Sequence, residues 1–248
     1  MAGRRRRSFG HIRGLLFDKD GTLFDYYQTW IPVLESSALL AARGDASAVE
    51  RLMVLCGFDP VTRRVPTGSV LAAGNTIELA ELWVAAKAGG QDGDVWAVDD
   101  LTHMLDQHFS VEGPARSAPV TDLVTFFRDL RASGFHTGIA TNDNAASAYA
   151  TVTRFGLADH IEFVCGYDSG HGTKPGPGMM HAFCQRVGLM PAEVAMVGDN
   201  FHDLEMARRA GAGLKVGVLT GTSTREDLTP YADIVLDSIV DLPAFLAT

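Results

Sequence analysis

Two aspartates near the start of the chain have the spacing of a nucleophile and an acid. They are Asp18 and Asp20, in the sequence Asp-Lys-Asp-Gly-Thr at residues 18–22, directly after the apolar run Ile12–Phe17. The run predicts a buried strand, and the glycine lets the chain turn just after the second carboxylate. Both carboxylates would then lie at the carboxyl end of one strand. That position is typical of an active site in an α/β protein.

Three further polar motifs follow predicted strands later in the chain. They are Thr141-Asn142, Lys174-Pro175 and Gly198-Asp199-Asn200-Phe201-His202-Asp203. In a parallel sheet, the carboxyl ends of the strands meet at one edge even when the sequence separates them widely. We therefore expect these motifs to join the two aspartates in a single site.

The order of the predicted elements indicates an α/β fold, with a Rossmann-like parallel sheet and helices on both faces. Strands are expected at Ile12–Phe17, Phe135–Ala140, Ile161–Cys165, Val194–Val197, Leu214–Leu219 and Ile234–Leu236. Helical periodicity lies between them at 121–132, 144–155, 177–187 and 202–210. Elements of both kinds alternate as they do in doubly wound sheets.

A helical segment interrupts this alternation after the first strand. Residues 26–114 are rich in Ala and Leu and mostly helical in period, with loops expected at 66–69 and 89–94. We therefore predict a catalytic core at 9–25 and 115–248, and an inserted helical cap at 26–114. Residues 1–8, which contain four consecutive arginines, are expected to be a disordered basic tail.

The bulk composition describes a folded, acidic protein. The 248 residues are 46% hydrophobic and carry a formal charge of −9 at pH 7, which disfavours binding to nucleic acid. We find no signal peptide, and no apolar run approaches the ~20 residues that cross a membrane. The three cysteines lack the spacing of a zinc site or a disulfide framework. We expect a cytoplasmic protein with no nucleic-acid or membrane partner, and the sequence leaves its oligomeric state open.

Taken together, the motifs resemble those of the haloacid dehalogenase-like hydrolase superfamily, and specifically its phosphoglycolate-phosphatase-like branch. The resemblance covers roughly residues 9–248, with specific motifs in the core and a loose likeness in the helical segment. It implies the parallel-sheet core described above and a helical cap that closes over the catalytic edge of the sheet.

The resemblance also implies roles for the polar motifs. Asp18 would attack phosphorus and become an aspartyl phosphate. Asp20 would protonate the leaving oxygen and then activate the hydrolytic water. Thr141 and Asn142 would hold a phosphate oxygen at a helix start, and Lys174 would offset charge on the transferred phosphoryl group.

Mg²⁺ is the expected cofactor, because a carboxylate that attacks a phosphate dianion meets charge repulsion. Asp18, Asp199 and the backbone carbonyl of Asp20 are the expected ligands, with Asp203 orienting metal-bound water. Asp199 and Asp203 have a simpler interpretation, as the N-cap and a first-turn acid of the following helix. The motif at residues 18–22 favours the metal role.

The function expected from these residues is Mg²⁺-dependent hydrolysis of a small phosphorylated metabolite, phosphoglycolate-like or a sugar phosphate. A sugar-phosphate mutase would use the same catalytic set and stays an alternative. Asp20 disfavours a dehalogenase and a phosphonatase, which lack it; the phosphonatase would also need a cap lysine, and Lys87 is the only lysine from residue 26 to 114. The complete catalytic set disfavours a binding module without turnover.

The substrate is expected to be selected by a loop of the helical segment. The best candidate contains Arg63 and Arg64, which could meet a substrate carboxylate. A solvated surface loop is an equally good interpretation of these two arginines.

Overall fold

The computed structural model describes residues 9–86 and 96–247. The predicted basic tail at 1–8, the predicted loop at 89–94 and Lys87 lie outside the described residues.

Six parallel strands form one sheet in the order β3-β2-β1-β4-β5-β6. The strands are β1 (Gly14–Phe17), β2 (His136–Ala140), β3 (Phe163–Cys165), β4 (Val194–Gly198), β5 (Leu214–Val218) and β6 (Ile234–Leu236). β1 and β4 lie at the centre and are buried along their whole length. Their unbroken apolar sequences fit this position, since a parallel sheet is covered on both faces.

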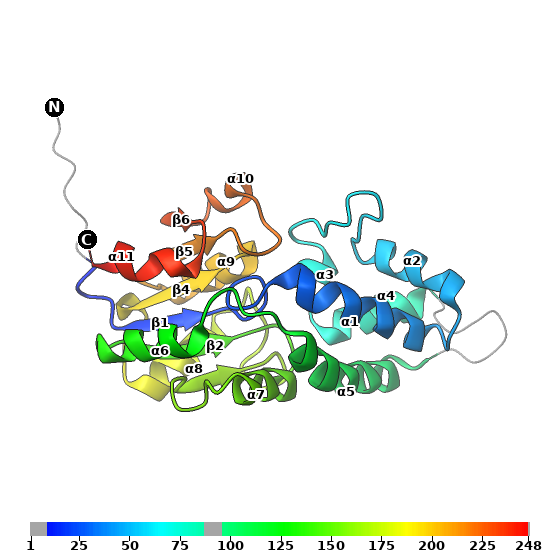
Figure 1. The fold of residues 1–248 in the computed structure, drawn as a ribbon, viewed down its shortest axis with the longest axis horizontal. Coiled ribbons are helices and arrows are strands. Elements are labelled where there is room, and N and C mark those ends of the chain that lie inside the picture. Colours follow the sequence, from blue (N-terminus) through cyan, green and yellow to red (C-terminus); the bar gives the residue numbers. More distant parts are fainter. Residues whose placement is uncertain (1–8, 87–95, 248) are drawn as a thin grey trace.

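Helices cover both faces of this sheet (Figure 1). They are α6 (Leu123–Ala132), α7 (Ala145–Arg154), α8 (Gly178–Val187), α9 (Phe201–Ala210), α10 (Arg225–Leu228) and α11 (Leu242–Leu246), with short 3₁₀ turns at Pro191–Glu193 and Ile239–Asp241. Leu15 and Phe17 of β1 pack with α6 and α11 on one face, whereas Leu16 packs with α8 and α9 on the other. This alternation follows from the two-residue period of a strand.

The predicted α/β fold is confirmed. Each predicted core strand and helix is present, with ends that differ by no more than two residues. The first strand, for example, begins at Gly14 rather than Ile12. Residues 12 and 13 instead belong to the approach to the sheet, where the Arg13 N–H donates to the carbonyl of Glu193.

In the described part of the chain, five helices between β1 and α6 form a second group, which we call the helical part (Figure 1). They are α1 (Tyr26–Ala41), α2 (Ala46–Leu55), α3 (Val70–Ala73), α4 (Thr76–Ala85) and α5 (Val98–Arg116). These helices share an apolar core of their own, which includes the fully buried Trp83 and Leu101. The expected loop at residues 66–69 is a loop in the structure.

The chain leaves the core and returns to it at adjacent points. The Asp25 N–H donates to the carbonyl of Ala118 at 2.8 Å, and the Val120 N–H donates to the carbonyl of Leu23 at 3.0 Å. The outgoing and returning segments of the chain are therefore hydrogen-bonded to each other next to the carboxyl edge of the sheet. The boundaries of the two domains stay predictions.

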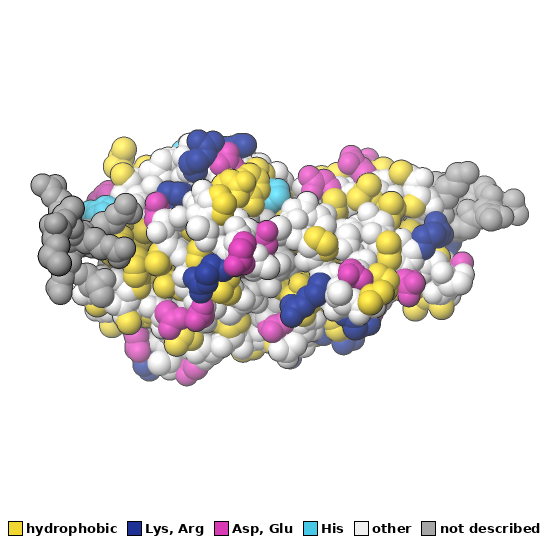
Figure 2. Space-filling model, turned by 90° about the horizontal axis from the view of Figure 1, so that it is seen from above, with side chains coloured by type: hydrophobic (Ala, Val, Ile, Leu, Met, Phe, Trp, Pro, Cys, Tyr) yellow, Lys and Arg dark blue, Asp and Glu magenta, His cyan; other side chains and the backbone are white. Residues whose placement is uncertain are grey.

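Acidic and basic side chains are mixed over the face seen in Figure 2 rather than gathered by sign. Across the parts of the chain that the structure describes, no helix combines the length and apolar character needed to cross a membrane.

Candidate active site

The carboxyl edge of the sheet and the helical part enclose a cavity of about 100 Å³. Most of the site residues expected from the sequence line it, namely Asp18, Asp20, Thr141, Asn142, Lys174 and Asp203. Asp199 lies next to this lining, because its carboxylate comes within 4.8 Å of those of Asp18 and Asp203. The structure thus brings together residues from four loops that follow β1, β2, β3 and β4.

Lys174 joins two of the carboxylates. Its Nζ lies 2.6 Å from Asp18 Oδ1 and 2.6 Å from Asp203 Oδ1, and all three side chains are almost fully buried. Burial raises the pKa of Asp18 to about 6, although the Lys174 ammonium lowers it. Burial also lowers the pKa of Lys174, but Asp18 and Asp203 outweigh it and raise this pKa above its ordinary value. Lys174 therefore stays charged beside the nucleophile candidate.

Within the described residues, no ammonium group pairs directly with the third carboxylate of the cluster. Asp199 is 3% exposed, and its Oδ2 accepts the N–H of Thr222 at 2.8 Å. Burial raises its pKa well above the ordinary value, and Asp18 and Asp203 raise it further. Three buried carboxylates thus share one lysine, which leaves a negative charge that a divalent cation would balance.

The donor atoms of this cluster fit Mg²⁺. All are oxygens, which are the ligands that this hard cation prefers, and the three carboxylates lie within reach of one ion. Close packing holds Asp199 in place, because a Cβ added at Gly21 would lie 2.6 Å from Asp199 Oδ2. Gly21 also has φ +84, a conformation that other residues rarely adopt. The glycine of the first motif therefore brings the backbone against the proposed metal ligand.

Asp203 serves the local helix as well. Asn200, and not Asp199, is the N-cap of α9, and the Asn200 N–H donates to Asp203 Oδ2 at 3.1 Å. The simpler interpretation of Asp203 as a first-turn acid is therefore correct alongside its place in the carboxylate cluster.

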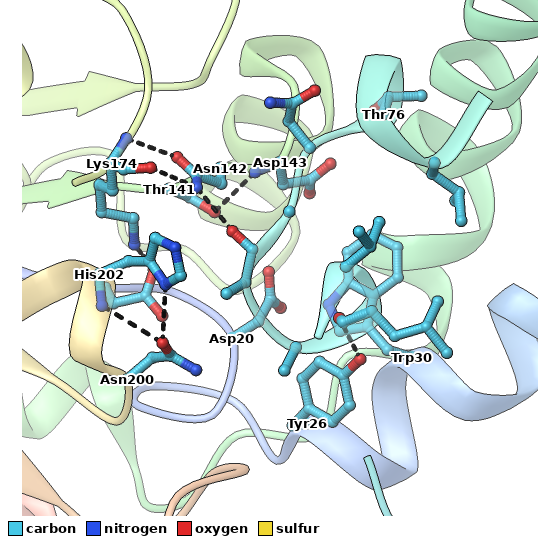
Figure 3. Close-up of a pocket in the computed structure, with 18 of the residues that line it drawn as sticks. Asp20, Tyr26, Trp30, Thr76, Thr141, Asn142, Asp143, Lys174, Asn200 and His202 are labelled. Carbon is cyan, nitrogen blue, oxygen red and sulfur yellow. Dashed lines mark hydrogen bonds and ion pairs between the residues drawn. The ribbon is translucent and has the colours of Figure 1, made fainter. Parts of the chain in front are cut away.

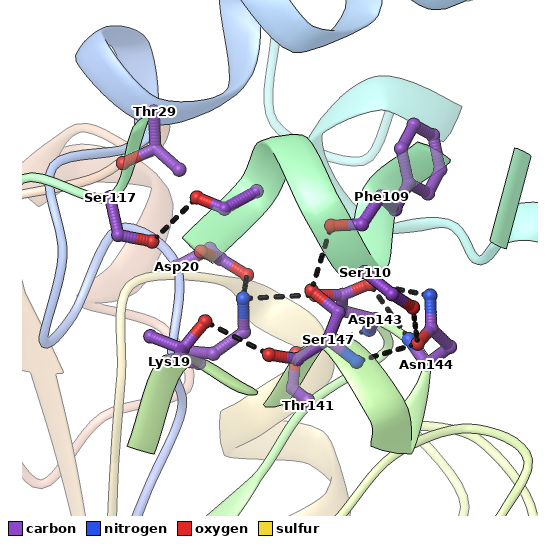
Figure 4. A network of polar contacts seen from close by, with 12 residues as sticks. Lys19, Asp20, Thr29, Phe109, Ser110, Ser117, Thr141, Asp143, Asn144 and Ser147 are labelled. Atoms are coloured by element: carbon purple, nitrogen blue, oxygen red, sulfur yellow. Dashed lines mark hydrogen bonds and ion pairs between the residues drawn. The ribbon is translucent and has the colours of Figure 1, made fainter. Parts of the chain in front are cut away.

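Asp20 belongs to a second charged group that includes Lys19 and Asp143 (Figure 4). Lys19 Nζ is fully buried, 2.8 Å from Asp20 Oδ2 and 2.9 Å from Asp143 Oδ2, and lies over the ring of Trp30. Burial raises the pKa of Asp20 to about 6; Lys19 lowers it, while Asp143 and Asp18 raise it. Within the described structure, Asp20 Oδ1 is buried and has no hydrogen-bond partner.

Replacement of Lys19 by methionine is expected to destabilise the fold at neutral pH. The change keeps most of the apolar stem but leaves Asp20 and Asp143 buried together without their cation. Removing one partner of a buried ion pair costs about 3–5 kcal/mol. Urea unfolding at pH 7.5, followed by circular dichroism, measures this loss.

A matched control is Lys215→Met. Lys215 Nζ also lies 2.8 Å from a carboxylate, that of Asp233, but both side chains are partly exposed. Exposed pairs contribute only about 0–1 kcal/mol. Equal losses of unfolding free energy in the two variants would show that the buried Lys19 group adds nothing beyond an ordinary surface pair.

Thr141 and Asn142 lie at the same edge, on the loop that leads into α7 (Figure 3). Thr141 Oγ1 accepts the N–H of Asp143 at 3.1 Å. The Asn142 amide donates to the carbonyls of Ala73 at 2.8 Å and Lys174 at 3.2 Å, and its Oδ1 accepts the N–H of Lys174. Asn142 therefore ties the helical part and the Lys174 loop to the core, while Thr141 lines the cavity.

The structure does not bring Arg63 and Arg64 to this cavity. Arg63 is exposed and pairs with Glu35 at 3.2 Å, and Arg64 lies over the ring of Tyr27. Neither is among the cavity-lining residues. Their expected role in binding a substrate carboxylate has no contact to support it here.

Two residues of the site received no role from the sequence. Lys19 was overlooked because a lysine that follows a strand usually reaches solvent. Its place between two carboxylates at the end of a buried strand was the available signal. Asp143 follows Thr141-Asn142 directly, so the position of that pair at the sheet edge also placed its carboxylate there.

Comparison with known proteins agrees with this arrangement. A family model described as haloacid dehalogenase-like hydrolase matches residues 12–211. The chain belongs to this family. The resemblance recognised from the motifs, including the phosphoglycolate-phosphatase-like branch, is confirmed, and so is the prediction of a hydrolase of the phosphatase type.

Individual relatives match over nearly the whole chain. The chain is 25% identical to a phosphoglycolate phosphatase from Salmonella typhimurium, with 94% of this chain and 91% of the relative covered. It is 27% identical to a phosphoglycolate phosphatase from Chromobacterium violaceum, with 94% and 95% covered. A solved structure described as a predicted phosphoglycolate phosphatase from Haemophilus somnus has a TM-score of 0.70 at 20% identity, with 94% and 97% covered. The structural match supports the fold alone.

Proposed function

We propose that this protein is a Mg²⁺-dependent phosphatase that hydrolyses a small phosphomonoester through an aspartyl phosphate on Asp18. The observation that carries the proposal is the pair of carboxyl groups that face one cavity. Asp18 is held beside the Lys174 ammonium, and Asp20 lines the same cavity and has one oxygen without a hydrogen-bond partner among the described residues. One of these carboxyls can act as a nucleophile while the other moves a proton.

The first half of the reaction uses both aspartates. A carboxylate oxygen of Asp18 forms a bond to phosphorus, and the bond from phosphorus to the leaving oxygen breaks. Asp20 gives its proton to that oxygen, so the product leaves as a neutral alcohol. The Lys174 ammonium offsets the negative charge on the phosphoryl oxygens, and Thr141 contacts one of them.

The second half returns the site to its starting state. Asp20, now ionised, takes a proton from a water molecule as that water attacks the phosphorus of the aspartyl phosphate. The bond between Asp18 and phosphorus breaks and inorganic phosphate forms. Asp18 regains its carboxylate beside Lys174, and Asp20 regains its proton.

The carboxylates of Asp18 and Asp199 and the backbone carbonyl of Asp20 would hold Mg²⁺, with Asp203 close behind them. The bound ion would screen the repulsion between the nucleophile and the substrate phosphate. Asp203 also holds Lys174 through its 2.6 Å contact, so it would position both positive groups of the site.

The proposed partner is a small phosphorylated molecule of the cytoplasm. A phosphoglycolate-like compound or a sugar phosphate was expected from the sequence, and the curated relatives cited above are named for phosphoglycolate. Phosphoglycolate is therefore the first natural compound to assay.

Chelation of divalent metal is expected to abolish hydrolysis of phenyl phosphate reversibly. Without Mg²⁺, Asp18, Asp199 and the substrate phosphate would repel one another at close range. Phosphate release is measured after dialysis against EDTA, and again after Mg²⁺ is restored in excess. Full activity in the chelator would contradict the proposed function, and so would a lack of activity when Mg²⁺ is present.

A folding control separates metal loss from unfolding. Circular dichroism of the EDTA-treated protein should match that of the untreated protein. The six-stranded sheet has apolar cores on both faces that do not involve the carboxylate cluster. If the EDTA-treated protein loses its helical signal, the loss of activity is due to unfolding rather than to the missing metal.

A further inference from the structure

The two ends of the cavity differ in chemistry (Figure 3). The end formed by the sheet carries the catalytic residues. The other end is formed by the helical part, and its lining is almost entirely apolar: Tyr26, Trp30, Leu34, Val70, Leu71, Ala72, Ala73, Leu79 and Phe109, together with Gly74, Asn75 and Thr76. A phosphomonoester whose phosphoryl group lies at Asp18 would place its leaving group at this apolar end.

Among the described residues, no side chain at the apolar end carries a positive charge that could balance a negative one. Among the described residues that line the whole cavity, Lys174 is the only lysine or arginine, and it lies at the catalytic end between Asp18 and Asp203. The charged group that contacts the α3–α4 turn is acidic: Glu78 Oε2 accepts the N–H of Asn75 at 3.1 Å. A carboxylate in the leaving group would therefore gain no cation at this end, and any water that it lost there would go uncompensated.

Backbone N–H groups and two carbonyls of this wall are also committed. The five N–H groups from Leu71 to Asn75 all donate within the protein. The carbonyl of Leu71 accepts from the Tyr26 hydroxyl, and that of Ala73 accepts from Asn142. A sugar-like leaving group with several hydroxyls would find few free partners here, and unpaired buried polar groups cost about 1–3 kcal/mol each.

Aromatic side chains limit the space at the apolar end of the cavity. The rings of Trp30 and Phe109 meet edge to face with centroids 5.1 Å apart, and both residues are buried. An apolar cavity of about 150 Å³ is enough for benzene. The cavity of about 100 Å³ must also hold the phosphoryl group, which favours a small leaving group.

From these observations we propose that the natural substrate is a phosphomonoester with a small, uncharged and mainly apolar leaving group. This inference rests on the proposed phosphatase function and narrows its substrate class. The proposed substrate differs from phosphoglycolate, for which the cited relatives are named, because phosphoglycolate would bring a carboxylate to the apolar end.

Three alkyl phosphates of similar size test the inference. Isobutyl phosphate has an apolar leaving group, phosphoglycolate a carboxylate, and glycerol 3-phosphate two further hydroxyls. All three release an alcohol and so need similar help from Asp20. With Mg²⁺ present, kcat/KM for isobutyl phosphate is expected to be at least about tenfold higher than for either of the others.

A pair of variants at Ala72 tests the cause of this preference. Ala72 lines the apolar end and is only partly buried, which leaves room for a longer side chain. Ala72→Arg would add a cation there, and Ala72→Gln is the uncharged control of similar length. The ratio of kcat/KM for phosphoglycolate to that for isobutyl phosphate should be about tenfold higher in the arginine variant than in the glutamine variant.

The outcomes are distinct for the two proposals. Preference of the unaltered protein for phosphoglycolate or glycerol 3-phosphate would overturn the inference and leave the phosphatase function standing. Release of phosphate from none of the three, nor from phenyl phosphate, would overturn both. If Ala72→Arg does not fold, as judged by its melting temperature, the comparison of the three substrates decides alone.

Discussion

Asp18→Asn is expected to remove phosphatase activity while the fold stays intact. An amide is nearly isosteric with a carboxylate but far too weak a nucleophile to attack phosphorus. Loss of a catalytic nucleophile costs on the order of 10³-fold or more in kcat. Turnover of phenyl phosphate with Mg²⁺ present measures the effect, which should be a loss to background.

The stability of this variant should be maintained or improved. Burial raises the pKa of Asp18, and the neighbouring Asp203 raises it further, so the ionised carboxylate is costly to the folded state. Asp237→Asn is a suitable control, because Asp237 is an exposed aspartate that does not line the cavity. Activity of Asp18→Asn within tenfold of the unaltered protein would exclude Asp18 as the nucleophile.

The core of the site was predictable because the sheet geometry is simple. Strands such as β1 and β4 appear in the sequence as continuous apolar runs. A parallel sheet places the residues that follow these strands at one edge. Asp18, Asp199 and Lys174 could therefore be grouped although up to 181 residues separate them. No knowledge of side-chain packing was needed for that step.

The internal pairing of the site was not predictable in the same way. Which carboxylate Lys19 or Lys174 contacts depends on rotamers and on the depth of each loop, and neither follows from spacing along the chain. Lys19 turned inward to join Asp20 and Asp143, where burial would be prohibitive for an unpaired ammonium. The two lysines thus serve different carboxylates although both lie at one edge.

The helical part was predictable only as a helical segment. Its wall of the cavity combines side chains of α1, α3, α4 and α5, and their convergence depends on how those helices pack. Adjacent arginines suggested an anion site, yet tertiary contacts to Glu35 and Tyr27 hold both away from the cavity. Apolar residues such as Leu34 and Leu79 look like ordinary core in the sequence.

Asp20→Asn is expected to slow alkyl phosphates far more than aryl phosphates. An alkoxide is a poor leaving group that needs the proton of Asp20, whereas a phenolate leaves with little help. General acid catalysis contributes on the order of 10²–10⁴-fold. Comparison of kcat/KM for isobutyl phosphate and phenyl phosphate, in the variant and the unaltered protein, measures the difference.

The same substitution should trap the phosphorylated enzyme. If Asp20 also activates water, Asp20→Asn forms the aspartyl phosphate from phenyl phosphate but hydrolyses it slowly. Rapid quench followed by mass spectrometry detects the adduct on Asp18. Lys19 keeps its contact with Asp143 in this variant, so the buried lysine is not left without a carboxylate.

The pH dependence supplies a further measurement on the same variant. Burial raises the pKa of Asp20 to about 6, so its proton is available below that pH and is lost as the pH rises through it. The kcat/KM for isobutyl phosphate should therefore fall above pH 6 in the unaltered protein, and this fall should be absent in Asp20→Asn. Equal losses on alkyl and aryl substrates, with an unchanged pH profile and no trapped adduct, would mean that Asp20 only shapes the metal site.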